Sequence, residues 1–117
     1  MQDFYSAQIA SVIFEGLYEW DYLGNPPSPV ARTAVALPTY SADRKTWTIK
    51  VKPGIYFTDD PAFGGKPREV TAQDVVYTVK RIFDPKYKSP NLSSLEEEKI
   101  LGLAELGRRA QAGGRFD

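Results

Sequence analysis

The sequence predicts an α+β fold, in which a small antiparallel sheet (a hairpin plus a short third strand) packs against two main helices. Apolar and polar residues alternate strictly in "TWTIKVK", residues 46–52, which indicates a strand. Apolar residues recur at helical spacing in residues 4–20 and again in residues 71–83. "PG" at residues 53–54 marks a turn at the end of the alternating strand.

Composition limits the classes of function. The 117 residues suffice for one domain, and 42% of them are hydrophobic. Fifteen basic residues balance fifteen acidic ones, so the chain has no long-range attraction to phosphate, and we expect no nucleic-acid partner. The absence of histidine and cysteine removes the commonest general base, thiolate catalysis and disulfides. Residues 1–10 lack the basic start and apolar run of a signal peptide.

The N-terminal segment reads as a helix followed by a loop. Apolar residues recur every fourth position from Tyr5 to Leu17, which predicts a helix over residues 4–20. The next segment, "DYLGNPPSP" at residues 21–29, combines glycine, asparagine and three prolines. Such a composition continues neither a helix nor a sheet, so this segment is predicted to be a loop.

Residues 32 to 52 are predicted to form the hairpin. Trp47, Ile49 and Val51 lie on one face of its second strand because side chains alternate along a strand. "TAVALPTY", residues 33–40, is the expected partner strand. "IYF", residues 55–57, is the expected third strand.

The second helix is predicted over residues 71–83. Thr71 and Asp74 have the spacing of a capping box, and Pro85 ends the helix. The apolar stripe of this helix is Val75, Val76, Val79, Ile82 and Phe83. Because valine is a poor helix former, the helix is expected to depend on packing against the apolar face of the hairpin.

The C-terminal part of the chain has a weaker pattern. A helical stripe at Leu103, Leu106 and Ala110 is interrupted by glycines. We therefore expect the ordered core at about residues 4–90, with less order in residues 91–117.

Carboxylates are the first candidates for chemistry. The neighbours Asp59 and Asp60 lie beside a glycine pair and suggest either an acid pair or a solvated turn. Residues 96–98, all glutamate, suggest either metal ligands or the wet face of a helix. Side chains of sequence neighbours point apart, and the spacing of a calcium loop is missing, so both sets favour the structural interpretation. "FGGK", residues 63–66, lacks P-loop spacing.

Aromatic side chains are the second candidates, since they stack on ligands. The aromatic residues considered are Trp20, Tyr22, Trp47, Tyr56, Phe57 and Tyr77. Most of them occupy apolar-face positions, which favours a place in the core. The residues alone therefore predict no catalytic site, no metal and no cofactor.

The order of the motifs resembles a known family. The chain contains "IFEGLYEWD", then "ALPTYSADRKTWTIKVKPGIYFTDD", then "GGKPREVTAQDVVYTVKRIFDPKYKSP". This series is similar to the extracellular solute-binding proteins of the peptide/nickel (oligopeptide/dipeptide) ABC-transporter family, over about residues 8–90. The chain departs from the family where a short "DG" turn is expanded to "DDPAFGGKPRE", and in its length. Family members are several times longer.

The resemblance implies both a fold and a function. The chain would be a fragment of the N-terminal lobe, residues 1–117 forming one subdomain of a periplasmic-binding-protein-like two-lobe fold. The whole protein would capture peptides or similar solutes in the periplasm or outside the cell and deliver them to an ABC permease in the membrane, without catalysis. The subdomain would be mainly scaffold, and it would reach the ligand at its edge through Asn91, Leu92, Ser93 and Ser94.

Two other functions remain open from the residues alone. One is a stand-alone hydrolase that uses the carboxylates at residues 59–60 or 96–98. The other is a small protein-interaction module with an exposed apolar surface. The fragment is expected to be monomeric, with some self-association.

Overall fold

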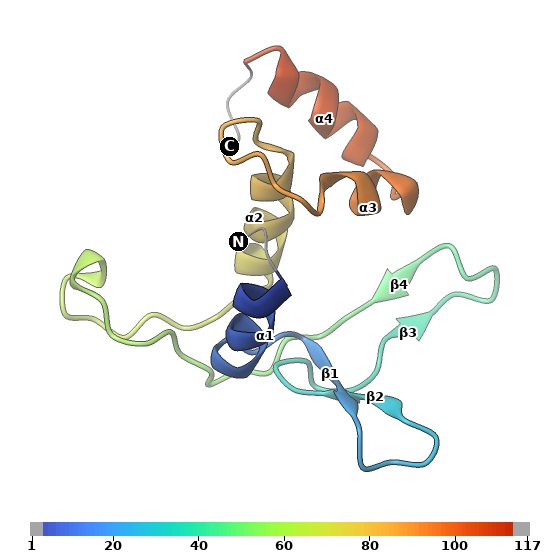
Figure 1. The fold of residues 1–117 in the computed structure, drawn as a ribbon, viewed down its shortest axis with the longest axis vertical. Coiled ribbons are helices and arrows are strands. Elements are labelled where there is room, and N and C mark those ends of the chain that lie inside the picture. The colour runs from blue at the N-terminus through green and yellow to red at the C-terminus, as the bar shows by residue number, and fades with distance from the viewer. Residues whose placement is uncertain (1–3, 114–117) are drawn as a thin grey trace. The chain divides into compact units, whose positions relative to one another are not determined.

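The computed structural model describes residues 4–113 and has α helices together with two small antiparallel sheets (Figure 1). The chain divides into two compact units, Met1–Ala72 and Gln73–Asp117. Residues 1–3 and 114–117, which belong to the predicted 1–117 subdomain, lie outside the described residues. The predicted α+β class is confirmed.

The first unit begins with α1, Phe4–Ile13, which is shorter than the predicted helix over residues 4–20. Tyr18–Asp21 forms strand β1 instead, so the C-terminal part of that prediction is wrong. The carbonyl oxygen of Leu17 accepts hydrogen bonds from the backbone amides of Arg32 (3.0 Å) and Ala34 (3.2 Å). These long-range partners, together with aromatic residues that favour strands, outweigh the local helical spacing.

Strand β1 pairs with β2, Ser28–Ala31, in an antiparallel register that places Tyr18 opposite Ala31 and Trp20 opposite Pro29. The predicted loop over residues 21–29 is therefore too long, because its last two residues belong to a strand. Pro29 fits there because the sheet has two strands, and a strand with an open edge tolerates a missing donor.

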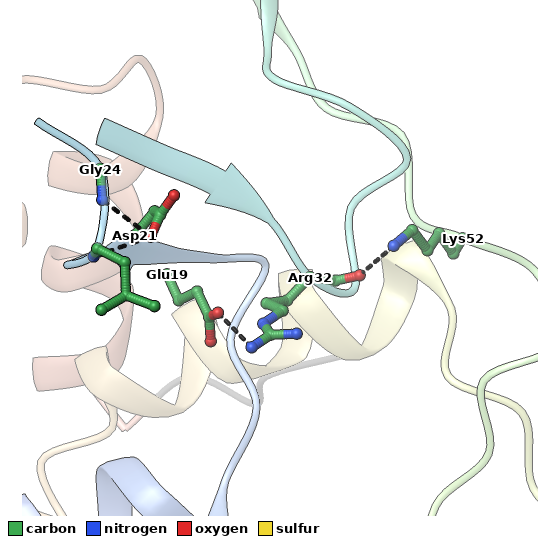
Figure 2. Close-up of polar contacts among 6 residues, drawn as sticks. Glu19, Asp21, Gly24, Arg32 and Lys52 are labelled. Atoms are coloured by element: carbon green, nitrogen blue, oxygen red, sulfur yellow. Dashed lines mark hydrogen bonds and ion pairs between the residues drawn. The ribbon is translucent and has the colours of Figure 1, made fainter. Parts of the chain in front are cut away.

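Polar contacts fix the β1–β2 hairpin to the chain that follows it (Figure 2). Arg32 forms an ion pair with Glu19 across the hairpin, and the carboxylate raises the pKa of the guanidinium through a hydrogen bond. The backbone carbonyl of Arg32 accepts a hydrogen bond of 2.6 Å from the ammonium group of Lys52. In the turn, the Asp21 carboxylate accepts from the amides of residues 23 and 24. Most of these contacts are to backbone groups, so they stabilise the backbone conformation at the turn and after the hairpin.

The predicted pairing of residues 33–40 with residues 46–52 is confirmed. Strands β3, Thr39–Tyr40, and β4, Trp47–Thr48, are antiparallel with Tyr40 opposite Trp47. A bridge between Ala34 and Val51 extends the pairing toward the hairpin base.

The predicted third strand pairs elsewhere. The amide of Phe57 donates to the carbonyl of Arg68 (2.9 Å), and the amide of Val70 donates to the carbonyl of Ile55 (2.8 Å). Residues 55–57 thus form a short ladder with the end of the loop that precedes the second helix. The prediction of a hairpin and a third strand in one sheet is therefore wrong. Among the described residues, each of the two sheets contains two strands.

The expected burial of the apolar hairpin face is also wrong. Trp47 is 57% exposed and Ile49 is 43% exposed, while Val51 is half-buried. Among the described residues of the first unit, the buried one is Ala34, which has no exposed surface. Period two in the sequence identified the strand correctly, but it does not say whether a covering layer is present.

The second unit consists of helices, and α2, Ala72–Phe83, begins one residue after the predicted start. Phe83 is 3% exposed, whereas Val76, in the same predicted stripe, is 46% exposed. Near the C-terminal end of α2, the Arg81 guanidinium lies 3.8 Å from the ring centroid of Tyr87. This cation–π contact ties the end of the helix to the turn that follows it.

Two further helices follow in the described part of the second unit: α3, Leu92–Glu97, and α4, Leu103–Gln111. Ala110 on α4 is 3% exposed, as the predicted stripe requires. Gly107 does not interrupt α4. A Cβ placed at Gly107 would lie 3.4 Å from the ring of Phe83, so the glycine lets that ring pack closely on the helix. No helix within residues 4–113 has both the length and the apolar character needed to cross a bilayer.

Candidate functional site

The adjacent carboxylates Asp59 and Asp60 lie at a small hollow of about 260 Å³ in the first unit. The Asp60 carboxylate accepts a hydrogen bond of 2.8 Å from the amide of Ala62 and caps the 3-10 helix η1, Pro61–Phe63. Asp60 therefore has a structural role as a helix cap. Both aspartates are exposed, which agrees with the solvated-turn interpretation.

The three glutamates at residues 96–98 lie at the end of α3 and just after it, and all are exposed. Within the part of the chain that the structure describes, no three acidic side chains come close enough together to hold a metal ion. This arrangement supports the wet-face interpretation of the glutamates.

A larger hollow, of about 540 Å³, lies between the end of α3 and α4. Its lining is mostly apolar and includes Leu101 and Leu103, with Arg108 among the charged groups. The Arg108 guanidinium donates to the Glu105 carboxylate at 2.5 Å, and this hydrogen bond lowers the pKa of Glu105. The charge of Arg108 is thus partly compensated within its own helix. Leu101 is fully exposed, so the hollow has little cover on that side.

The four residues expected at the edge of the ligand site lie together in the second unit. Asn91 precedes α3, and Leu92, Ser93 and Ser94 form the first turn of that helix. The amide of Asn91 donates to the Ser89 hydroxyl (3.3 Å). Leu92 is half-buried and the other three are exposed, so their polar side chains are available at the surface. Their contact with a ligand stays a prediction.

The aromatic residues expected in the core are mostly at the surface. Phe57 is half-buried, but the exposed fraction is above one half for the remaining five: Trp20, Tyr22, Trp47, Tyr56 and Tyr77. The core interpretation is wrong for these five in the structure of this chain.

Sequence reasoning missed an aromatic cluster at the β3–β4 hairpin. The rings of Tyr40 and Trp47 lie 5.1 Å apart, and the Arg44 guanidinium lies 5.5 Å from the Tyr40 ring. The indole of Trp47 donates to the carbonyl of Arg44 at 2.8 Å. The direct pairing of Tyr40 with Trp47 was the available signal, because opposed residues in an antiparallel pair have neighbouring side chains. These contacts connect the two strands of the hairpin with the turn between them.

Comparisons with known proteins agree with the motifs. Residues 28–109 match the sequence model of "Bacterial extracellular solute-binding proteins, family 5 Middle". Over 100 residues, or 86% of this chain, the sequence is 34% identical to "Periplasmic oligopeptide-binding protein OppA" of Escherichia coli (strain K12). The chain spans 16% of the length of that relative. No solved structure gave a significant match.

Proposed function

The chain belongs to the bacterial extracellular solute-binding proteins of family 5, and from this premise we propose that it is part of a receptor that binds peptides for an ABC importer. The observation that carries the proposal is the 34% identity to an oligopeptide-binding protein along 86% of the chain. The receptor acts in the periplasm or outside the cell, and its partners are a peptide and a membrane permease.

Within that receptor, residues 1–117 form one subdomain of the first lobe of a two-lobe fold, and the subdomain acts mainly as scaffold. One of the exposed carboxylates, that of Asp60, caps a helix, and this structural role supports the assignment as scaffold. Two lobes that close on a peptide by a hinge need rigid supporting elements on each side. The hairpins and helices of this chain fit that role.

The direct test is calorimetric titration of the full-length protein with short synthetic peptides. We expect binding of peptides and no binding of free amino acids, because a cleft that recognises extended backbone loses most of its contacts with a single residue. Failure of every peptide to bind, or a gene that ends at codon 117, would contradict the proposal.

A second test separates scaffold from site. The 117-residue chain alone should bind no peptide, because one subdomain supplies only one edge of the cleft. In the full-length protein, Asn91→Ala and Leu92→Ala should weaken peptide affinity by less than about tenfold, as peripheral contacts do. Gln73→Ala, at an exposed position of the second unit outside both hollows, is the control and should leave affinity unchanged. Loss of all binding in either edge variant would make these residues central to the site.

A further inference from the structure

Two cationic side chains lie around one tyrosine ring after the end of α2. The Arg81 guanidinium is 3.8 Å from the ring centroid of Tyr87, and the Lys86 ammonium group is 6.0 Å from the same centroid. The two charges are therefore no more than about 10 Å apart, which is about one Debye length at about 0.1 M ionic strength. All three residues are exposed. Because the two cations repel each other at this distance, a bound anion would stabilise both.

Contacts with two rings hold the Arg81 guanidinium in place. Besides its contact with Tyr87, it lies 5.7 Å from the ring centroid of Tyr77 and donates a hydrogen bond of 3.3 Å to the Tyr77 hydroxyl. A guanidinium has five N–H donors, so this bond leaves donors that can reach a ligand. A planar guanidinium held against rings is preorganised to donate two parallel hydrogen bonds to a carboxylate. We call Tyr77, Arg81, Lys86 and Tyr87 the Tyr87 cluster.

The cluster has an excess of positive charge. Residues 81–88 contain three basic residues and one acidic residue, Asp84. The Asp84 carboxylate is half-buried and accepts a hydrogen bond of 2.9 Å from the backbone amide of Lys86. Figure 1 shows α3 running away from the turn that follows α2, so the glutamates at residues 96–98 are separated from the cluster. An anionic ligand therefore fits the cluster better than a cationic or neutral one.

The place of the cluster in the chain indicates which anion it meets. Tyr87 is four positions before Asn91, the first of the residues proposed at the edge of the peptide site, and four residues span at most about 14 Å. The backbone turns in this segment, since the amide of Leu92 donates to the carbonyl of Ser89 (3.4 Å). A peptide that contacts this edge is thus only a few of its own residues from the cluster.

We propose that the Tyr87 cluster binds the side-chain carboxylate of an acidic residue in the peptide, so that the receptor prefers peptides with glutamate or aspartate at one position. Arg81 donates to the carboxylate, and Lys86 adds a second positive charge beside it. This inference rests on the proposed function, because it takes the ligand to be a peptide that passes the edge of this subdomain.

The test is calorimetric titration of the full-length protein with tetra-alanine peptides in which each position in turn carries glutamate or its neutral isostere glutamine. At one position, the glutamate peptide should bind roughly fivefold more tightly than the glutamine peptide, as expected for an exposed charge pair. This preference should fall when the salt concentration is raised from about 0.1 M to about 1 M, because the Debye length shortens from about 10 Å to about 3 Å.

Variants show whether the cluster is the source of the preference. Arg81→Gln and Lys86→Gln should each lower the ratio of the two affinities, and the double variant should abolish it. Lys86→Gln keeps the inference testable if Arg81→Gln unfolds α2, because Lys86 lies beyond the end of that helix. Arg109→Gln is the matched control: Arg109 is an exposed basic residue of α4 in the same unit, and its replacement should leave the ratio unchanged.

Three results would overturn the inference. The first is equal binding of the glutamate and glutamine peptides at every position, which would leave the proposed function standing. The second is a preference that persists in the double variant, since the acidic residue would then be bound elsewhere. The third is binding of the wild-type protein to vesicles that contain phosphatidylglycerol, lost in the double variant, which would assign the cluster to a membrane surface. If no peptide binds at all, the proposed function fails together with the inference.

Discussion

Replacing Phe83 with alanine tests the core of the second unit most directly. Phe83 is 3% exposed, and its ring packs on α4 at Gly107. Removal of a buried phenylalanine costs about 3–5 kcal/mol of unfolding free energy, from lost transfer energy and the cavity left behind. The unit Gln73–Asp117 has 45 residues (117 − 73 + 1), so its whole stability is about 2–7 kcal/mol at 0.05–0.15 kcal/mol per residue. The substitution therefore removes much or all of it.

Two spectroscopic probes distinguish the units. Both tryptophans, Trp20 and Trp47, lie in the first unit, whereas α2, α3 and α4 contain 12, 6 and 9 of the helical residues against 10 in α1. Circular dichroism at 222 nm thus reports mainly on the second unit, and tryptophan fluorescence reports on the first. Phe83→Ala should reduce the ellipticity in buffer and leave the fluorescence spectrum and its urea midpoint unchanged.

Val76→Ala is the control for this experiment. It lies on the same helix and also removes an apolar side chain, but Val76 is 46% exposed and alanine is the better helix former. It should leave the ellipticity unchanged or slightly raise it. If Phe83→Ala retained full ellipticity, or shifted both probes equally, the assignment of a separate Phe83 core would be refuted.

Three further predictions concern local features. Gly107→Val should lower the ellipticity, because the added Cβ already lies 3.4 Å from the Phe83 ring and the two methyl groups beyond it displace that ring; an unchanged spectrum would contradict the packing. Gly54→Ala should lower the urea midpoint of tryptophan fluorescence by the equivalent of about 1 kcal/mol, since Gly54 has φ +77°, a conformation unfavourable for alanine; an equal or higher midpoint would speak against that turn. The Ser41 hydroxyl donates to Asp43 and lowers the pKa of that carboxyl below its ordinary value. The contribution of this hydrogen bond to stability is present above the pKa that Asp43 has in the unfolded chain, and it is lost as the pH falls through the pKa of Asp43 in the folded chain. Ser41→Ala should therefore raise the Asp43 pKa measured by NMR titration, and an unchanged pKa would rule out the hydrogen bond.

The elements predicted correctly are those that a short stretch of sequence specifies by itself. The second helix was placed to within one residue because a proline ends it and its apolar spacing is regular. The pairing of the hairpin strands followed from alternation alone. In contrast, residues 18–20 were predicted as the end of a helix and still form part of β1, because β1 pairs with residues 28–31, the first two of which were predicted as loop. Strand pairing is a long-range property, and periodicity within one segment does not contain it.

The candidate site was predicted less completely. The carboxylates at residues 59–60 and 96–98 were interpreted correctly as surface groups, since neighbours in sequence rarely converge. The cation–π contacts of Arg44 and Arg81 were missed, because each depends on a turn that brings a guanidinium over a ring. Asn91 and its three neighbours were placed by family resemblance, and no feature of their own spacing would have singled them out.

The errors about burial share one physical origin. Sequence patterns assign Trp47, Ile49 and the stripe of α1 to an interior, yet all of them are exposed in this chain, and the buried core of the described residues is Ala34, Phe83 and Ala110. Apolar periodicity records which face of an element is selected for burial, whatever the covering layer is. A chain that spans 16% of a longer relative can carry such faces without the layers that cover them.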